Sequence, residues 1–380
     1  MKVAVPKETR PGELRVALVP KDVKTLAKLG LEVVVEAGAG RTSAISDEEY
    51  VAAGARVVTT AAEALAGAGI VLRVSPPSLS GPDEVGGIER GAILVSFLNP
   101  FANPDLVRRL ATTGVTSFAM ELVPRITRAQ SMDALSSQAT AAGYKAVLLA
   151  ATHLPRFLPM FTTAAGTIRP GKALILGAGV AGLQAIATSR RLGAIVEAFD
   201  VRPAVKEQVQ SLGAKFLEAE HAVTAEGEGG YAKELSEDQH KRELELIAGA
   251  IVTADIVIAT AQIPGRRAPI LITEDMVKSM KPGSLIVDLA AETGGNCALT
   301  RAGETVVVGG VQIIGPTNIA ATIPVHASQM YSRNIVTLVG EFVGKDGQLA
   351  LDFANDVVGP STLTHGGEVK NERVRQAIGG

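Results

Sequence analysis

The stretch KALILGAGVAGLQAIATSRRLG, residues 172–193, decides the fold of this chain. Its first five residues are typical of a buried strand, and the segment from Val180 onward has the composition of a helix. A Gly-x-Gly-x-x-Gly turn at Gly177, Gly179 and Gly182 joins them. In such a turn the first glycine allows the tight bend, the second lets a pyrophosphate approach the backbone, and the third lets helix and strand pack closely. We therefore predict a strand–turn–helix unit that binds a dinucleotide, with the phosphates at the helix N-terminus.

An acidic residue follows the next apolar segment. The segment AIVEAF, residues 194–199, is typical of a second strand, and Asp200 comes directly after it, 18 residues beyond Gly182. A carboxylate at this place hydrogen-bonds the ribose hydroxyls of a dinucleotide and repels a 2′-phosphate. We therefore expect NAD(H) to bind in preference to NADP(H), although Arg202, two residues further on, could accommodate a phosphate.

Short apolar segments alternate with helical ones along most of the chain, which is typical of βαβ units that build a parallel sheet. A first set of strands is expected at residues 2–5, 32–37, 55–58, 70–74, 92–97 and 116–121. A second set is expected at residues 172–176, 194–199, 214–219, 255–260, 284–289, 305–310 and 311–315. The tail from Gln348 alternates apolar and polar residues between glycine turns, which predicts a hairpin that returns to the first set.

The two sets predict two α/β domains, each a doubly wound parallel sheet, with the second, a Rossmann fold, inserted into the first. Long helices expected at 134–153 and 325–343 bracket the second set, and we expect both to cross the junction. The first domain then comprises residues 1–135 and 325–380, and the Rossmann domain comprises residues 136–324.

Composition excludes several classes of protein. The 380 residues include 37 basic and 39 acidic side chains, and aromatic residues make up 3% with no tryptophan. A nucleic-acid binder usually has a basic surplus and aromatic side chains that stack on bases, so we expect no nucleic-acid partner. The single cysteine, Cys297, excludes an intramolecular disulfide and a multi-cysteine metal site, and no other ligand spacing predicts a metal.

The sequence also lacks an obvious membrane span, which needs about 20 mostly apolar residues. The nearest candidate, residues 173–189, is short and contains three glycines. We therefore expect a cytoplasmic chain whose membrane role, if any, comes from a partner.

A polar loop precedes the first long helix. Residues 124–133, PRITRAQSMD, combine two arginines, a glutamine, an aspartate and hydroxyls. We expect this loop at the cleft between the domains, where ligands commonly bind. The alternative is an ordinary helix N-terminus, in which Ser131 or Asp133 caps the helix and the arginines are solvated.

Several motifs together resemble one family. RAQSMD (128–133) followed by LSSQ (135–138) is similar to the signature of the NAD(H)-binding component, domain I, of the proton-translocating nicotinamide nucleotide transhydrogenases, which are related to the alanine dehydrogenases. The resemblance extends over nearly the whole chain, and the other similar motifs are VPKETRPGELRVALVP (5–20), DVRPAVKEQVQSLGAKF (200–216), GGYAKE (229–234) and LIVDLAAETGGNC (285–297).

The resemblance implies roles for individual residues. Arg125, Asp133 and Ser136 would hold the nicotinamide carboxamide and ribose, and Gln130 would bridge toward NADP(H) on another subunit. Gly230 and Tyr231 would lie on a mobile loop that closes over NAD(H), in agreement with the glycine-rich, polar composition of residues 224–230. Gln262, at the end of a strand, would lie by the adenine or ribose. The remaining residues implied to bind NAD(H) are Ile126, Thr127, Ser131, Met132, Val180, Val201 and Arg202.

Alanine dehydrogenases are the main alternative, since they share the opening motif that includes Arg15. That family uses a lysine and a histidine for proton transfer, and this chain has Ser75 and Asn99 at the matching positions. Reductive amination needs a general acid and base, whereas hydride transfer between two nicotinamides needs only positioning. The two replacements therefore favour transhydrogenase chemistry.

The resemblance finally implies a complex. The chain would pass a hydride from NADH to NADP⁺ on a partner subunit, coupled to proton translocation by a membrane-spanning subunit. It would be a homodimer and a peripheral subunit on the cytoplasmic face of the inner membrane. A stand-alone amino-acid dehydrogenase and a non-catalytic NAD(H)-sensing module remain as alternatives.

Overall fold

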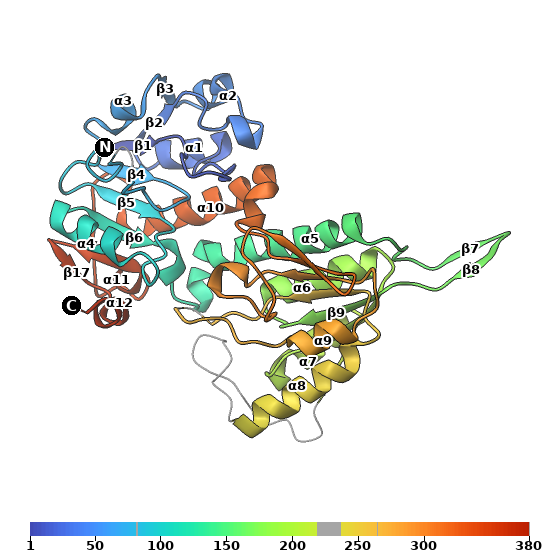
Figure 1. Cartoon of the computed structure of the whole chain (residues 1–380). Helices are drawn as coiled ribbons and strands as arrows, with labels where there is room; N and C mark the ends of the chain where they lie inside the picture. The colour runs from blue at the N-terminus through green and yellow to red at the C-terminus, as the bar shows by residue number, and fades with distance from the viewer. Residues whose placement is uncertain (81–82, 219–236, 264, 380) are drawn as a thin grey trace. The chain divides into compact units, whose positions relative to one another are not determined.

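The computed structural model describes residues 1–80, 83–218, 237–263 and 265–379 (Figure 1). The chain divides into two compact units. The first unit comprises Met1–Gln138 and Ala321–Gly380, and the second comprises the intervening segment Ala139–Ala320. Each unit contains its own large sheet.

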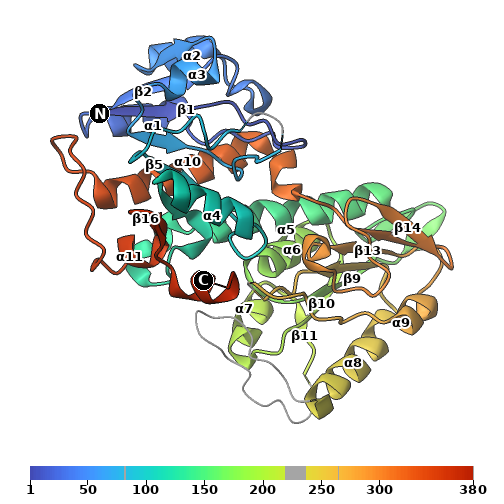
Figure 2. The ribbon, with the colours of Figure 1, turned by 60° about the vertical axis from the view of Figure 1, so that its left-hand side comes forward.

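The sheet of the first unit has eight strands in the order β17-β16-β6-β5-β4-β1-β2-β3. Its parallel part consists of β1 (Lys2–Val5), β2 (Glu32–Glu36), β3 (Arg56–Val58), β4 (Ile70–Leu72), β5 (Ile93–Ser96) and β6 (Thr116–Ala119). The C-terminal tail adds β16 (Thr362–His365) and β17 (Glu368–Val369), and β16 pairs antiparallel with β6. The hairpin expected in the tail is therefore confirmed, and Figure 2 shows it beside α4 (Pro104–Thr113).

One long helix forms the centre of the core of the first unit. The helix α10 (Pro324–Phe342) buries Tyr331, Ile335 and Phe342 against the strands, and the Phe342 ring stacks on Phe118 of β6 with ring centroids 4.6 Å apart. The helix α5 (Ala134–His153) runs from one unit into the other, whereas α10 begins after the second boundary and lies entirely in the first unit, so the expectation that both helices cross was wrong. The other helices of this unit are α1 (Pro20–Ala27), α2 (Asp47–Ala52), α3 (Ala61–Leu65), α11 (Val358–Ser361) and α12 (Glu372–Ala377).

The second unit contains a seven-stranded sheet in the order β11-β10-β9-β12-β13-β15-β14. The strands are β9 (Lys172–Leu176), β10 (Ile195–Phe199), β11 (Lys215–Phe216), β12 (Ile256–Ala259), β13 (Leu285–Asp288), β14 (Thr305–Val308) and β15 (Val311–Ile314). All neighbours pair in parallel except β14 and β15, which form an antiparallel hairpin at one edge. The apolar pattern predicted both strands in a parallel set, but only Gly309 and Gly310 separate them, and two residues with positive φ make a hairpin turn.

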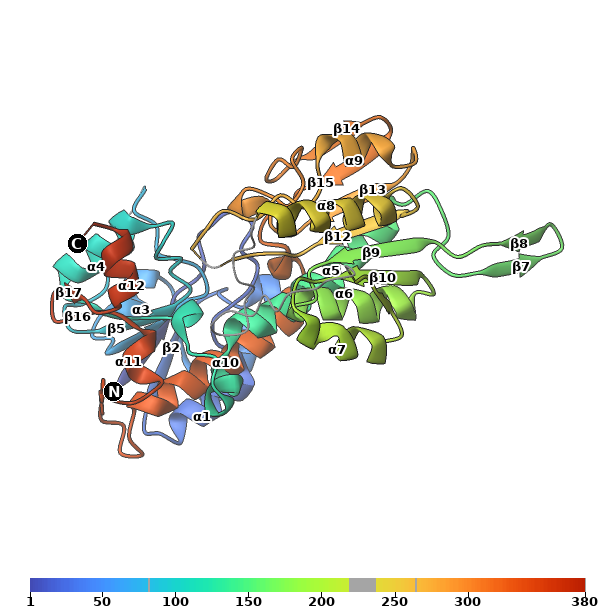
Figure 3. The same ribbon diagram turned by 90° about the horizontal axis from the view of Figure 1, so that it is seen from below.

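Helices cover both faces of this sheet (Figure 3). Ala173 and Ile175 of β9 pack on one side with α5, α6 (Val180–Arg191) and α7 (Lys206–Ser211). Leu174 and Leu176 pack on the other side with α8 (Glu237–Ile251) and α9 (Glu274–Ser279). Burial on both sides explains why the strand KALIL is apolar at almost every position.

A separate hairpin, β7 (Phe161–Thr163) with β8 (Gly166–Ile168), projects from the second unit and was not expected from the sequence (Figure 1). Within the described ranges, no helix is long and apolar enough to cross a bilayer.

Candidate dinucleotide site

The glycine turn lies between β9 and α6, as its spacing predicts. Gly177 has a φ of +94°, which favours glycine, and a Cβ there would lie 2.7 Å from Thr260 Oγ1. A Cβ on Gly182 would lie 1.8 Å from the Gly177 carbonyl oxygen, so only glycine allows α6 to approach the turn. At Gly179, by contrast, the nearest atom to a Cβ is Arg202 Nη2 at 4.0 Å. The backbone at Gly179 is therefore open to a ligand, and the turn fits a pyrophosphate.

Asp200 follows β10 and is already engaged by neighbouring groups. Its Oδ2 accepts a hydrogen bond from the Ala178 backbone N–H at 2.7 Å. The Arg202 side chain donates to both carboxylate oxygens at 2.8 Å, and the Arg202 backbone N–H donates to Oδ1 at 2.9 Å. The acid predicted to select NAD(H) and the arginine predicted to accommodate a phosphate thus form a two-point ion pair in the second unit.

Hydrogen bonds that were not predicted from the sequence fix the backbone next to Gln262, at the ends of β12 and β13. Asp288, at the end of β13, is fully buried and accepts hydrogen bonds from the backbone N–H groups of Asn296 and Cys297 and from the Thr300 hydroxyl. The Asn296 side chain in turn bonds both backbone groups of Ala261. Gln262 Nε2 donates to the Leu289 carbonyl at 2.7 Å. The sequence contained one indication of this arrangement, because the aspartate of LIVDL, Asp288, lies at the end of a predicted strand.

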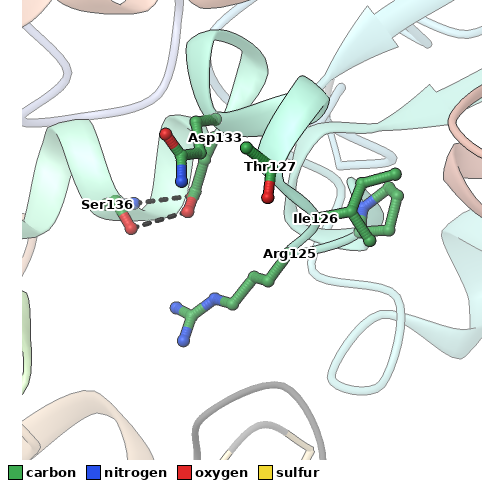
Figure 4. Close-up of a pocket in the computed structure, with 7 residues that line it drawn as sticks. Arg125, Ile126, Thr127, Asp133 and Ser136 are labelled. Carbon is green, nitrogen blue, oxygen red and sulfur yellow. Dashed lines mark hydrogen bonds between the residues drawn. The ribbon is translucent and has the colours of Figure 1, made fainter.

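The polar loop of the first unit forms a cavity of about 390 Å³ (Figure 4). Most of the loop residues singled out from the sequence come together there, and the cavity is lined by Pro124, Arg125, Ile126, Thr127, Gln130, Asp133 and Ser136. Figure 4 shows the Arg125 side chain extended beside Asp133 and Ser136. Two other residues of the predicted set, Ser131 and Met132, do not line the cavity. Met132 is 2% exposed and packs in the core.

The capping interpretation of this loop is correct for Asp133. Asp133 Oδ1 accepts from the Ser136 backbone N–H at 2.8 Å, and Oδ2 accepts from the Ser136 hydroxyl at 2.6 Å, at the start of α5. Because both residues also line the cavity, capping and ligand binding are compatible here. The cap fixes the orientation of the Asp133 carboxylate at the cavity wall.

Arg128 is exposed to solvent, as the capping interpretation expects, but it also forms ion pairs and hydrogen bonds. Its guanidinium donates to Asp356 and Glu341 at 2.8 Å and to the side chain of Asn355 at 2.8 Å. These partners lie on α10 and the C-terminal segment, more than 200 positions away in sequence. Arg128 therefore anchors the 3-10 helix η3 (Thr127–Met132) and does not face the cavity.

Ser75 and Arg15 belong to a buried polar cluster. Arg15 donates to both carboxylate oxygens of Glu13, at 2.8 and 2.7 Å, and to Gln138 Oε1 at 2.9 Å. The Ser75 hydroxyl donates to the same Glu13 carboxylate at 2.9 Å. A substrate carboxylate would have to displace Glu13 before it could form a two-point pair with Arg15.

Asn99 lies on a strained turn next to a partly buried acid, Glu121. The φ of Asn99 is +46°, in the left-handed region. The backbone N–H groups of Leu98 and Asn99 both donate to the Glu121 carboxylate. Burial raises the pKa of Glu121 to about 7, in spite of those backbone hydrogen bonds, which lower it.

Two further expectations concern the loop and metals. Gly230 and Tyr231, with the rest of residues 224–230, lie outside the described residues. Among the residues that the structure does describe, no group of three histidine, cysteine or acidic side chains could hold a metal ion.

The parallel sheet, the glycine turn and the acid after β10 define a dinucleotide-binding protein of the Rossmann type. Comparisons with known proteins identify the family. Family models described as "Alanine dehydrogenase/PNT, N-terminal domain" and "Alanine dehydrogenase/PNT, C-terminal domain" match residues 4–142 and 146–372.

Individual relatives agree with these matches. An NAD(P) transhydrogenase alpha subunit of Rhodospirillum rubrum is 48% identical over 374 residues, which cover 97% of each chain. Alanine dehydrogenase of Mycobacterium tuberculosis is 30% identical over 386 residues, covering 100% of this chain and 97% of that one. The crystal structure of transhydrogenase from Sinorhizobium meliloti has a TM-score of 0.88 at 50% identity, covering 97% of this chain and 100% of that one. The chain belongs to the alanine dehydrogenase/PNT family, with the NAD(P) transhydrogenase alpha subunits, and is an oxidoreductase subunit.

Proposed function

We propose that this chain is the NAD(H)-binding subunit of a proton-translocating transhydrogenase. It passes a hydride from NADH to NADP⁺ on a partner subunit, and a membrane-spanning subunit couples the transfer to proton translocation. The chain acts as a homodimer at the cytoplasmic face of the inner membrane. The observation that carries this proposal is the convergence of Arg125, Gln130, Asp133 and Ser136 on one cavity.

The second unit provides the binding of the adenosine and pyrophosphate. The open backbone at Gly179 and the N-terminus of α6 at Val180 suit two phosphates. Asp200, which is held in place by the Ala178 N–H, suits the ribose hydroxyls. The same proposal assigns supporting contacts to Val201, Arg202, Gly230, Tyr231 and Gln262.

The first unit orients the reacting ring. The nicotinamide supplies the hydride when NADH is bound. Arg125 donates hydrogen bonds to acceptors such as a carboxamide oxygen, and the Asp133 carboxylate accepts them from donors such as a carboxamide N–H₂ or a ribose hydroxyl. Gln130 can donate and accept, which suits a residue between two nucleotides. Hydride transfer from carbon to carbon moves no proton at the reacting atoms, so these residues need only position the ring.

The residues at the two positions where alanine dehydrogenases have their proton-transfer groups argue against amino-acid dehydrogenation. Ser75 donates to Glu13 and Asn99 has no titratable side chain, so neither position supplies an acid or base near neutral pH. Arg15 is engaged by Glu13 and Gln138. The carboxylate of Glu121, whose pKa is raised to about 7 by desolvation, already accepts hydrogen bonds from two backbone N–H groups.

Reconstitution tests the proposal. The purified chain alone should bind NADH, measured by nicotinamide fluorescence, but should reduce neither NADP⁺ nor pyruvate with ammonia. Addition of the soluble NADP(H)-binding subunit of the same enzyme should start transfer between nucleotides without a membrane. Steady pyruvate-dependent NADH oxidation by the chain alone would make it an amino-acid dehydrogenase, and tight NADH binding with no transfer after reconstitution would make it a sensing module.

Variants of the cavity test the assignment of residues. Asp133→Asn and Gln130→Asn should lower the transfer rate up to about 100-fold, because a misplacement of ~1 Å can have that effect, with a much smaller change in NADH affinity. Asp105→Asn on α4 removes the same charge from a side chain that is 85% exposed and serves as the matched control. Normal transfer kinetics in Asp133→Asn would leave Asp133 with its capping role alone.

A further inference from the structure

A chain of buried hydrogen bonds connects α10 to the loop that lines the cavity. Asn334 of α10 is 7% exposed. Its Nδ2 donates to the Ser131 carbonyl at 2.8 Å, and its Oδ1 accepts from the Ser137 hydroxyl at 2.7 Å. One side chain thus bonds both the end of η3 and the first turn of α5, on either side of Asp133 and Ser136.

The same chain of hydrogen bonds continues to the polar cluster of the first unit. Gln138 Nε2 donates to the Ser137 hydroxyl at 3.2 Å, and Gln138 Oε1 accepts from Arg15 at 2.9 Å. From Arg15 to the Ser131 carbonyl, each group therefore donates a hydrogen bond to the next one. As a result, the side-chain amides of Gln138 and Asn334 each have only one orientation that satisfies both of their neighbours.

The loop that lines the cavity contains the 3-10 segment η3, in which the hydrogen-bond geometry is poorer than in an α-helix. The closing bond from the Asp133 N–H to the Gln130 carbonyl is 3.3 Å long. The position of the loop therefore depends on tertiary contacts, among them the core packing of Met132 and the hydrogen bond from Asn334 to the Ser131 carbonyl.

We propose that Asn334 is a positioning residue for hydride transfer: through Ser131 and Ser137 it sets where Gln130 and Asp133 present their side chains, without lining the cavity itself. This inference rests on the proposed function. The proposal also assigns a role to Arg15, which lies at the far end of the series of hydrogen bonds that leads to the loop.

Two variants at this position test the proposal. Asn334→Ala removes both hydrogen bonds, and Asn334→Asp keeps the shape and the acceptor for Ser137 but places an oxygen against the Ser131 carbonyl. In the full chain reconstituted with the NADP(H)-binding subunit, both variants should lower the transfer rate by about 10- to 100-fold, since ~1 Å of misplacement can have an effect of that order. The dissociation constant for NADH should change less than about threefold, because the turn at Gly177 is intact.

Ser332 provides a matched control on the same helix. It is fully buried, accepts from the Val19 N–H at 3.0 Å and donates to Asp22 at 2.7 Å, and these partners belong to α1 and its N-cap, not to the loop. Ser332→Ala should lower the unfolding midpoint by about as much as Asn334→Ala and leave the transfer rate at the wild-type value. An equal loss of rate in Ser332→Ala would show a general destabilisation and overturn the proposal.

A second measurement does not depend on the partner. The fluorescence anisotropy of bound NADH reports the freedom of the reduced nicotinamide, and it should fall in both Asn334 variants at saturating NADH. Wild-type anisotropy and transfer rate in both variants would overturn the role of Asn334. Absence of transfer by the reconstituted wild type would instead refute the proposed function, while the anisotropy still decides whether Asn334 positions the ring.

Discussion

The ion pair between Asp200 and Arg202 leads to a prediction about nucleotide selectivity. In Asp200→Asn the side chain keeps an oxygen that can accept the Ala178 N–H but loses the charge that holds the Arg202 guanidinium. The variant therefore changes two properties of the ribose subsite. The acceptor for the ribose hydroxyls becomes neutral, and the positive charge of Arg202 is no longer balanced.

The magnitude follows from these two changes. A hydrogen bond to a charged acceptor contributes about 1.5–3 kcal/mol and one to a neutral acceptor about 0.5–1.5 kcal/mol, so NADH should lose about 1 kcal/mol, or roughly fivefold in affinity. For NADPH, a carboxylate about 4 Å from a phosphate would be repelled by up to about 4 kcal/mol in a medium of effective dielectric constant about 20. Allowing for partial solvation, we expect at least a tenfold gain, or about 1.4 kcal/mol. The preference for NADH should therefore fall roughly 50-fold.

The assay is equilibrium binding of NADH and NADPH to the isolated chain, followed by nicotinamide fluorescence at fixed ionic strength. The wild type should bind NADH at least tenfold more tightly than NADPH, a difference of about 1.4 kcal/mol or more. Arg202→Gln is the control, because it leaves the Asp200 charge and removes the cation. It should weaken NADPH binding further and change NADH binding only a few-fold.

Two results would refute this reasoning. Equal wild-type affinities for NADH and NADPH would mean that Arg202 neutralises the discrimination by Asp200. An unchanged preference in Asp200→Asn would mean that the carboxylate does not face the ribose and serves only to hold Ala178 and Arg202.

Three further predictions concern the fold. Gly182→Ala should abolish NADH binding or folding, because its Cβ would overlap the Gly177 carbonyl at 1.8 Å, whereas Gly249→Ala on α8, with nothing within 4 Å, should raise the free energy of unfolding by about 0.5–1 kcal/mol. Burial raises the folded-state pKa of Glu121 from 4.5 to about 7, so between these pH values the folded state binds more protons than the unfolded state. The free energy of unfolding should therefore fall as pH rises from 4.5 to 7. Glu121→Gln should remove this pH dependence, measured by urea titrations. Cys297 is 1% exposed, and burial raises the pKa of its thiol. A thiol reagent should therefore label Cys297 only when the protein opens, and the labelling rate should rise with denaturant concentration.

Local chemistry explains what could be predicted from the sequence. The glycines at 177, 179 and 182 and the acid at position 200 are recognisable because each meets a requirement of one turn or one strand end. The apolar strands of both sheets were recognisable because burial on two faces leaves almost no polar position. The polar composition of residues 124–133 likewise marked the loop that lines the cavity.

The sequence by itself thus determined the parallel parts of the two sheets, the glycine turn and the candidate residues, because these depend on neighbours a few positions away. Only the tertiary structure decided the partners of those residues. Arg128 bonds groups on α10 and in the C-terminal segment, and Asn334 reaches Ser131 across 203 positions. Composition could not predict such pairs, since many acids and amides could bond either residue equally well. The choice among them is made by packing, because a buried polar group remains stable only where the folded chain brings it a partner.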